Sequence, residues 1–441
     1  MSARKSHPVR QRVVGVHPQR GGATLIVVSV LFFIVALVAA YANRNLIFEQ
    51  RTSANQQRST LAFEAADAGV EWAVAMLNVG RVDATCQPVD NNAATSFRDR
   101  YLEIDTTTGL VQPRANLAAG SLPTCVYNGT QWLCSCPTTG APSIAGAPTD
   151  IVAPAFRLRF VQRPANRPGT IWVEVQACTR LDDGCLGFGA ANAAAREGRA
   201  RTSVLLALRS VLPSPPVATL TTRGTINLAD TTVRVSNPGR GNNPSLAIQA
   251  GGAVSPVDPV LTTMLGGAAG ELVSQQTHAP GGDASLTVVP SGEHLFGSLF
   301  GIQPTVYRDQ PASLILNCTV PCDAPTIRAV AARNPGRIIW ALGDVNLDSG
   351  ASLGTAAEPV ILVVVEGDLT ASNIQINGLV YGSKTDWSFT GINTSLRGAV
   401  IAEKNLVVSG TVALIRDAEI LDVLRLRHGS FVRVPGGWSD Y

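Results

Sequence analysis

The side chains that could carry catalysis are few and scattered. Beyond residue 22 the histidines are His278, His294 and His428, and each stands in a different sequence neighbourhood. No nucleophile motif, metal pair or phosphate-binding loop accompanies them. Asp344 and Asp368 both follow a glycine, and a row of carboxylates on one face of a repetitive fold would suit a polysaccharide-cleaving enzyme. Aspartate also caps turns through its own side chain, and this interpretation predicts no catalytic residue, no cofactor and no enzyme activity.

The four cysteines that stand in two short segments predict local disulfide bonds. Cys178 and Cys185 flank a turn, and Cys318 and Cys322 flank Thr-Val-Pro. A metal site is the alternative, but Cys-x-x-Cys does not occur and histidine is scarce, so we expect no metal. Asp182 and Asp183, inside the first of these loops, are consistent with a calcium site or with a polar turn.

The other four cysteines predict two bridges whose partners the spacing leaves open. Cys134 and Cys136 are too close to bridge each other comfortably, so we expect them to pair with Cys86 and Cys125 in an undetermined order. If this part of the chain lies outside the cytoplasm, the cysteines face an oxidising compartment, which favours disulfide bonds over a metal site.

A long apolar run near the N-terminus explains how the chain would leave the cytoplasm. Residues 23–42 contain no charged side chain and, as a helix, would span about 30 Å, the thickness of a hydrocarbon core. Basic residues precede the run, and the first acidic residue is Glu49, so the N-terminus is predicted to stay cytoplasmic. A cleaved secretory signal would have a shorter apolar region and small residues after it. Here Gly21 and Gly22 precede the run, which leaves a simple signal anchor as the plain alternative.

The helix is predicted to continue beyond the membrane run. No proline occurs between residues 43 and 79, and apolar residues recur there at steps of three and four. This amphipathic second half predicts a helix packed against a globular head. The stripe consists of Phe63, Ala66, Val70, Ala73, Val74 and Leu77.

Three motifs along this helix resemble the N-terminal region of the PilX minor pilins of type IV pili. They are Gly-Gly-Ala-Thr-Leu-Ile-Val-Val from Gly21, Glu-Gln-Arg from Glu49 with Ala-Asn-Gln from Ala54, and Ala-Phe-Glu-Ala-Ala-Asp-Ala-Gly from Ala62. The resemblance implies cleavage by a prepilin peptidase after Gly22 and methylation of Ala23. It also implies that the apolar helix later packs in the core of a pilus, through residues such as Leu25, Val27, Leu31, Phe32 and Phe33.

Val27 departs from the general pilin pattern. Major pilins carry a glutamate as the fifth residue after the cleavage site, where it pairs with the N-terminal amine of a neighbouring subunit. An unpaired carboxylate in an apolar core costs several kcal/mol, so a subunit with no neighbour above it is better without one. PilX and its type II secretion analogue GspK resemble this chain in lacking the glutamate, which implies a place at the filament tip.

The composition narrows the range of partners. The whole chain has a formal charge of +3, and removal of the five positive charges of residues 1–22 leaves about −2. This balance of charges gives no reason to expect nucleic-acid binding through a basic surface.

The resemblance to PilX minor pilins implies the prepilin peptidase, other minor and major pilins, the inner-membrane assembly platform and a tip adhesin as partners. The expected location is the bacterial inner membrane before assembly and the pilus tip afterwards.

The remainder predicts an α+β protein with two β-rich parts after the helix. Residues 1–22 form the leader, 23–80 the helix, 81–212 a disulfide-containing antiparallel head, and 213–222 a proline-rich linker. Residues 223–441 contain short β-branched runs between recurring glycines and share the pattern Gly-x-[Ile/Val]-Asn-Leu at Gly224 and Gly343, which predicts a β-solenoid. A β-sandwich is the alternative, since the spacing is irregular.

Two further segments of this region carry predictions. Residues 251–337 are expected to be an insertion that projects from the solenoid and separates its first coil from the later ones. The aromatic C-terminus, with Trp438 and Tyr441, is expected to cover the last coil or to dock onto a partner.

These observations predict a minor pilin that primes filament assembly and supports motility or adhesion. A GspK-like pseudopilin of a type II secretion system is the closest alternative. A membrane-anchored solenoid protein that binds or cleaves carbohydrate is the alternative from another class.

Overall fold

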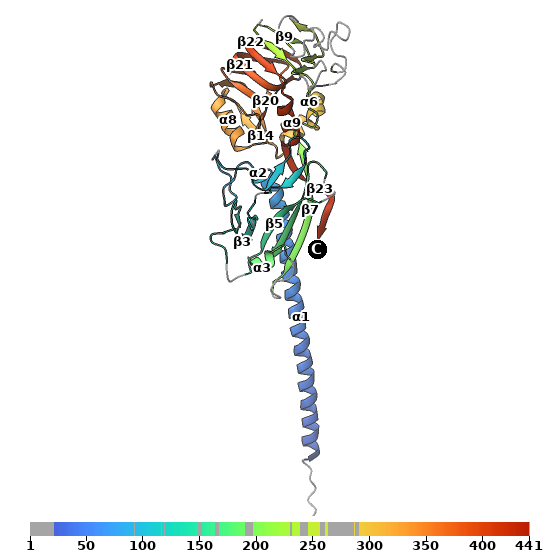
Figure 1. The fold of residues 1–441 in the computed structure, drawn as a ribbon. Helices are drawn as coiled ribbons and strands as arrows, with labels where there is room; N and C mark the ends of the chain where they lie inside the picture. Colours follow the sequence, from blue (N-terminus) through green and yellow to red (C-terminus); the bar gives the residue numbers. More distant parts are fainter. Residues whose placement is uncertain are drawn as a thin grey trace, which may run out of the picture. The chain divides into compact units, whose positions relative to one another are not determined.

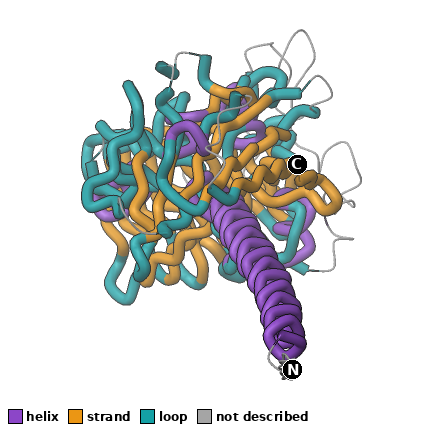
Figure 2. The backbone as a smooth tube through the Cα atoms, turned by 90° about the horizontal axis from the view of Figure 1, so that it is seen from below, coloured by secondary structure: helices purple, strands orange, loops and turns teal. Residues whose placement is uncertain are grey.

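A long helix begins the described part of the chain. The computed structural model describes residues 22–91, 93–115, 117–118, 120–148, 152–163, 167–189, 197–229, 232–238, 246–255, 261–262, 286 and 291–440. Helix α1 (Gly22–Leu77) runs without interruption for 56 residues (Figure 2), and the predicted long helix is confirmed. The chain forms two compact units, one up to Arg58 and one from Ser59, so that α1 contributes its first part to one unit and its last part to the other.

The last part of α1 packs against an antiparallel sheet of six strands. The strand order is β23-β7-β6-β5-β3-β4, as Figure 1 shows in part. The apolar faces of these strands form one core with the stripe of small residues on α1. The strands are β3 (Thr124–Tyr127), β4 (Trp132–Ser135), β5 (Ala155–Val161), β6 (Thr170–Cys178), β7 (Arg199–Ser210) and β23 (Gly429–Asp440).

Gly69 allows the helix to approach this sheet closely. A Cβ atom at this position would lie 2.6 Å from Val175 Cγ1 and 2.9 Å from the ring of Phe156, closer than packed carbon atoms come. Ala62, Ala66 and Ala73 are fully buried, whereas Phe63, which the predicted stripe included, is 51% exposed. The small residues of α1 therefore set the distance between helix and sheet.

Short elements at the edge of the sheet complete this part. Helix α2 (Phe97–Tyr101) follows α1, and Ser96 caps its N-terminus by accepting from the backbone N–H of Asp99. The hairpin-like pair β1 (Leu102–Ile104) and β2 (Val111–Pro113) comes next, and α3 (Asp183–Leu186) follows β6.

Parallel strands stacked in three ladders form a β-solenoid in the same unit. The first ladder runs β14-β16-β18-β20-β21-β8-β11, and the second runs β15-β17-β19-β21-β22-β9-β12. The third contains parts of β20, β21 and β22 with β10 and β13. Their bounds are β8 (Leu220–Thr222), β9 (Ile226–Leu228), β10 (Arg234–Ser236), β11 (Ile248–Ala250), β12 (Val254–Ser255), β13 (Leu261–Thr262), β14 (Ser313–Asn317), β15 (Cys322–Asp323), β16 (Ile338–Leu342), β17 (Val345–Asp348), β18 (Val360–Val365), β19 (Leu369–Ser372), β20 (Gln375–Gly382), β21 (Asp386–Ala402) and β22 (Asn405–Ile415).

The irregular glycine spacing has a simple origin in the coils. Ile338 pairs with Ile361, Ile361 with Leu379, and Leu379 with Ala399, so successive coils advance by 23, 18 and 20 residues. Glycines stack at the corners, and a Cβ atom at Gly398 would lie 1.8 Å from the carbonyl oxygen of Gly378. The predicted solenoid is confirmed, and the sandwich alternative is wrong because these ladders are parallel.

The order of the coils in space differs from their order in the sequence. Leu220, in the first coil of the sequence, pairs with Val400 from a late coil and with Ile248 on its other side. The predicted projecting insertion over residues 251–337 is wrong for its described residues, because β12, β13, β14 and β15 all belong to the ladders. The described residues of this segment do not separate the first coil from the later ones either, because β8 pairs directly with β21 and β9 with β22. Strand pairings this far apart leave no local signal in a sequence, which is why the prediction failed.

Helices cover the outer side of the first ladder. One apolar core joins that side to α6 (Gly292–Phe300), α7 (Pro304–Arg308) and α9 (Ala418–Leu426). Helix α8 (Ala324–Arg333) contributes Ala324 and Ile327 to the core inside the coils.

The C-terminal strand belongs to the antiparallel sheet and not to the solenoid. Gly429 pairs with Ser210 and Asp440 with Thr202, so β23 completes the sheet beside β7. The expectation that Trp438 covers the last coil is therefore wrong, and Tyr441 lies outside the described residues. The linker predicted over residues 213–222 is too long, because its last residues, Leu220–Thr222, form β8. The whole solenoid is thus inserted between two neighbouring strands of the sheet.

Candidate functional site

The first part of α1 presents apolar side chains on every side. Leu25, Val27, Leu31, Phe32 and Phe33 are 63–73% exposed, and no residue between 22 and 60 is buried by the chain itself. Such a helix is too apolar for water and requires lipid or other helices around it. Among the described residues, it is the helix whose length and composition suit a membrane span.

The predicted processing site stands at the beginning of this helix. Gly22 is the first residue of α1, and a Cβ atom there would meet nothing within 4 Å. The leader before Gly22 lies outside the described residues. Cleavage between Gly22 and Ala23 stays a prediction.

Comparison with known families gives one match to this helix. The PilX N-terminal family model matches residues 20–71. This segment is similar to the N-terminal segment of PilX-type pilins. The resemblance found in the sequence is confirmed over these residues, and the apolar helix is compatible with an inner-membrane anchor.

Other comparisons add little to the PilX-type segment. No curated protein matches the chain. The crystal structure of the competence-associated pilin ComZ from Thermus thermophilus is similar with 12% identity and a TM-score of 0.21, over 87% of this chain and 97% of that chain. A TM-score of this size does not establish a common fold for the two whole chains.

The PilX-type helix contains no carboxylate in its apolar part. Val27 occupies the fifth position after Gly22, its side chain is 63% exposed, and the first acidic residue of α1 is Glu49. A neighbouring subunit's amine would find no anionic partner at Val27.

All eight cysteines form disulfide bonds in the structure. Two pairs, Cys178–Cys185 and Cys318–Cys322, are the local bridges that the spacing predicted. The sequence left the other pairing open, and the structure pairs Cys86 with Cys136 and Cys125 with Cys134. The first of these ties the segment after α1 to the sheet edge, since Cys86 follows α1 and Cys136 follows β4.

Asp344 and Asp368, which the sequence suggested as a row of catalytic carboxylates, hold turns of the solenoid. Asp344 Oδ1 accepts from the backbone N–H of Asp368 at 2.9 Å, and Asp368 Oδ1 accepts from the backbone N–H of Ser388 at 3.0 Å. Lys384 Nζ lies 2.9 Å from the other oxygen of Asp368. Each carboxylate is therefore engaged in joining one coil to the next, which is the turn-capping role that the sequence also allowed.

The other polar candidates lie apart from one another. Asp182 caps α3 by accepting from Cys185 N–H, and Asp183 forms an ion pair with Arg157 at 2.6 Å. His294 contacts Ser291 at the start of α6, and His278 lies outside the described residues. Within the described part of the chain, no group of three or more metal-ligating side chains is present.

His428 is buried where the solenoid returns to the sheet. Its Nε2 lies 3.1 Å from the carbonyl oxygen of Pro359, and its Nδ1 lies 3.3 Å from that of Val423. Burial, helped by the nearby guanidinium groups of Arg98 and Arg427, lowers the pKa of His428 to about 4. The imidazole is therefore neutral at physiological pH.

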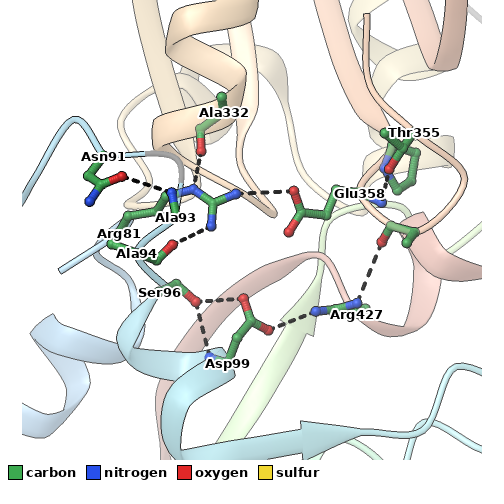
Figure 3. A network of polar contacts seen from close by, with 12 residues as sticks. Arg81, Asn91, Ala93, Ala94, Ser96, Asp99, Ala332, Thr355, Glu358 and Arg427 are labelled. Carbon is green, nitrogen blue, oxygen red and sulfur yellow. Dashed lines mark hydrogen bonds and ion pairs between the residues drawn. The ribbon is translucent and has the colours of Figure 1, made fainter. Parts of the chain in front are cut away.

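A polar network that the sequence did not predict joins the solenoid to the segment after α1. Arg81 donates to Glu358 at 3.3 Å and to the carbonyl oxygens of Ala94 and Ala332 (Figure 3). In the same view, Arg427 donates to Asp99 at 2.9 Å. The partners stand 277 and 328 positions apart in the chain, so no spacing rule could have found them.

The charge of Asp99 is stabilised within this network. Burial alone would raise its pKa, but the guanidinium groups of Arg427 and Arg98 and the hydroxyl of Ser96 outweigh burial and lower the pKa below the usual value. Asp99 is therefore ionised across the physiological range, and its pair with Arg427 holds the two β-rich parts together.

Proposed function

We propose that this chain is a minor pilin that primes assembly of a type IV pilus at the inner membrane and occupies the filament tip. The observation that carries the proposal is Val27, at the fifth position of an apolar helix whose segment is PilX-type. The head would support motility or adhesion, and the role is non-enzymatic.

The proposal depends on whether another subunit lies above this one in the filament. A glutamate at the fifth position is useful only where a neighbouring N-terminal amine neutralises it, because a lone carboxylate in an apolar core costs several kcal/mol. A subunit that starts the filament has no such neighbour. Valine at this position therefore suits the first subunit of the filament.

The proposal names partners and a location. A prepilin peptidase would cleave after Gly22, and the inner-membrane assembly platform would extract the helix into a filament of other minor and major pilins. A tip adhesin is a further partner. The N-terminus would be cytoplasmic and the head periplasmic until assembly places the head at the pilus tip.

The mass of the mature N-terminus tests the pathway. We expect the protein isolated from cells to begin at a methylated Ala23, and Gly22→Leu to keep Met1 while the adjacent Gly21→Ala is still cleaved. A wild-type product that begins at Met1 would leave a tethered periplasmic domain and end the filament proposal.

Two single substitutions test the tip position. Under the proposal, Val27→Glu and the neighbouring Val28→Glu both place an unpaired carboxylate in the apolar helix and both reduce surface pili. If Val27→Glu is tolerated and Val28→Glu is not, position 27 meets an amine from a subunit above, and the tip role is wrong.

A deletion strain separates the proposal from a GspK-like role in type II secretion. Loss of surface pili and of twitching motility, with normal protein secretion, is the expected result. Loss of secretion with normal pili would assign the chain to a secretion pseudopilus.

A further inference from the structure

A cavity of about 500 Å³ lies between α8 and the solenoid loop of residues 352–360. Arg328 and Asn334 line it from α8 and its C-terminal end, and Arg337 lines it from the segment that follows. Ser352 and Thr355 line it from the loop. A second cavity of about 630 Å³, bordered by the end of α1, shares Asn334 and Arg337 with the first.

Positive charge exceeds negative charge around these cavities. The carboxylates that line them are already paired: Glu358 with Arg81 at 3.3 Å, Asp90 with Arg333 at 3.2 Å, and Glu71 with Arg433 at 2.9 Å. No ion pair between described residues includes Arg328 or Arg337. The cavity therefore holds two guanidinium groups without a carboxylate partner from the described chain.

Arg337 is held beside the cavity by neutral acceptors. Its Nη1 donates to Asn334 Oδ1 and its Nη2 to the carbonyl oxygen of Ser313, both at 3.2 Å, while the buried Nε has no hydrogen-bond partner among the described residues. Burial lowers the pKa of Arg337, and the charge of Arg98 lowers it further. Neutral acceptors hold the side chain in place but do not offset its charge, as a bound anion would.

We propose that this cavity binds the carboxylate of an acidic side chain of a protein partner. Guanidinium groups recognise carboxylates through paired N–H donors. The residues that line the cavity include no aromatic side chain on which a sugar ring could stack. Small apolar residues, among them Pro325, Ala332 and Leu353, line the remaining wall and suit a peptide backbone. The inference concerns a partner of the head and does not depend on the role of Val27.

Binding of short peptides to the full-length chain in detergent tests the proposal. One probe is a pool of eight-residue peptides of alanine, serine and proline with a central glutamate, and the matched pool carries glutamine there. All peptides are acetylated at the N-terminus and amidated at the C-terminus, so that the glutamate side chain is the carboxylate under test. Galacturonate and inorganic phosphate serve as the sugar and free-anion probes. The variants are Arg337→Met and Arg328→Gln, and the control is Arg308→Gln, since Arg308 is a half-exposed arginine of α7 paired with the adjacent Asp309.

We expect the glutamate pool to bind the wild type at least about tenfold more tightly than the glutamine pool, and each cavity variant to lose about tenfold or more. Arg308→Gln should bind as the wild type does. If Arg337→Met does not fold, peptide binding by Arg328→Gln, on the surface of α8, decides the test. Equal binding of both pools, unchanged binding by the cavity variants, or preferential binding of galacturonate or phosphate would overturn the proposal.

Discussion

The side chain of Asn78 forms two hydrogen bonds with the backbone of Phe431. Asn78 Nδ2 donates to the carbonyl oxygen of Phe431 at 2.9 Å, and the N–H of Phe431 donates to Asn78 Oδ1 at 2.8 Å. The amide thus acts as one residue of an additional strand beside β23 and fixes the C-terminal strand to the end of α1.

Asn78→Ala should lower the free energy of unfolding by about 1–3 kcal/mol, because it leaves two half-buried backbone groups of Phe431 without their partners. Denaturant unfolding of the full-length chain in detergent measures the change. The control is Asn227→Ala, on the exposed side of β9. Equal unfolding of the two variants would mean that Asn78 does not hold β23.

Gly69→Ala should destabilise the protein although alanine favours helices. The substitution gains about 1 kcal/mol of helix propensity, but the new methyl group would clash with Val175 and Phe156, and overpacking costs about 1–3 kcal/mol. Glu64→Ala, on the exposed side of the same helix, is the control. An increase in the unfolding midpoint of Gly69→Ala would contradict the close helix–sheet approach.

His428 should make stability fall in mildly acidic solution. Its folded-state pKa of about 4 lies below the ordinary value of 6.5, so the unfolded chain binds the proton first as the pH falls through this window. The contribution that is present above pH 6.5 amounts to about 3 kcal/mol and is lost by pH 4. We expect the difference in unfolding free energy between the wild type and His428→Gln to shift by this amount across the window; a constant difference would refute the buried neutral imidazole.

Glu403 should make stability fall as the pH rises, the opposite of the effect of His428. Burial and the nearby charges of Glu293 and Glu366 raise the pKa of Glu403 from 4.5 to about 7. The hydrogen bond from Tyr381 acts to lower it but is outweighed. The folded state therefore binds the proton more tightly, and its contribution is present below pH 4.5 and lost as the pH rises to 7. Since the group is partly exposed, we expect Glu403→Gln to gain only about 1–2 kcal/mol over the wild type across this interval. The exposed Glu103→Gln should show no such trend, and the same trend in both variants would rule out a local cause.

The disulfide bonds should differ in their effect on stability. Cys86 and Cys136 stand 50 positions apart, and Cys318 and Cys322 only 4. Loss of the longer loop should cost about 4 kcal/mol, and loss of the shorter about 2 kcal/mol, since the closed loop restricts the unfolded chain. Paired replacement by alanine and denaturant unfolding check the order of the two effects; a larger loss for the shorter loop would refute the argument.

Local patterns predicted the elements but not their partners. The apolar run, the stripe that includes Ala66 and Ala73, and the glycine-spaced runs after Gly343 predicted α1 and the solenoid, because each pattern repeats within a few residues. The pairing of Leu220 with Val400, and of Ser210 with Gly429, depends on segments far apart in the chain and has no local signal. The arginines of the cavity beside α8 were missed for the same reason, since their surroundings exist only after the coils have formed.

The insertion of the solenoid between β7 and β23 has a consequence for biogenesis. Residues 398–415 pair with strands near residue 220, and residues 429–440 pair with the strand that ends at residue 210, so neither sheet is complete until these later segments have been made. A chain that stops before them leaves two open sheet edges, to which other chains can pair. The antiparallel sheet can therefore close only after the entire solenoid has been synthesised.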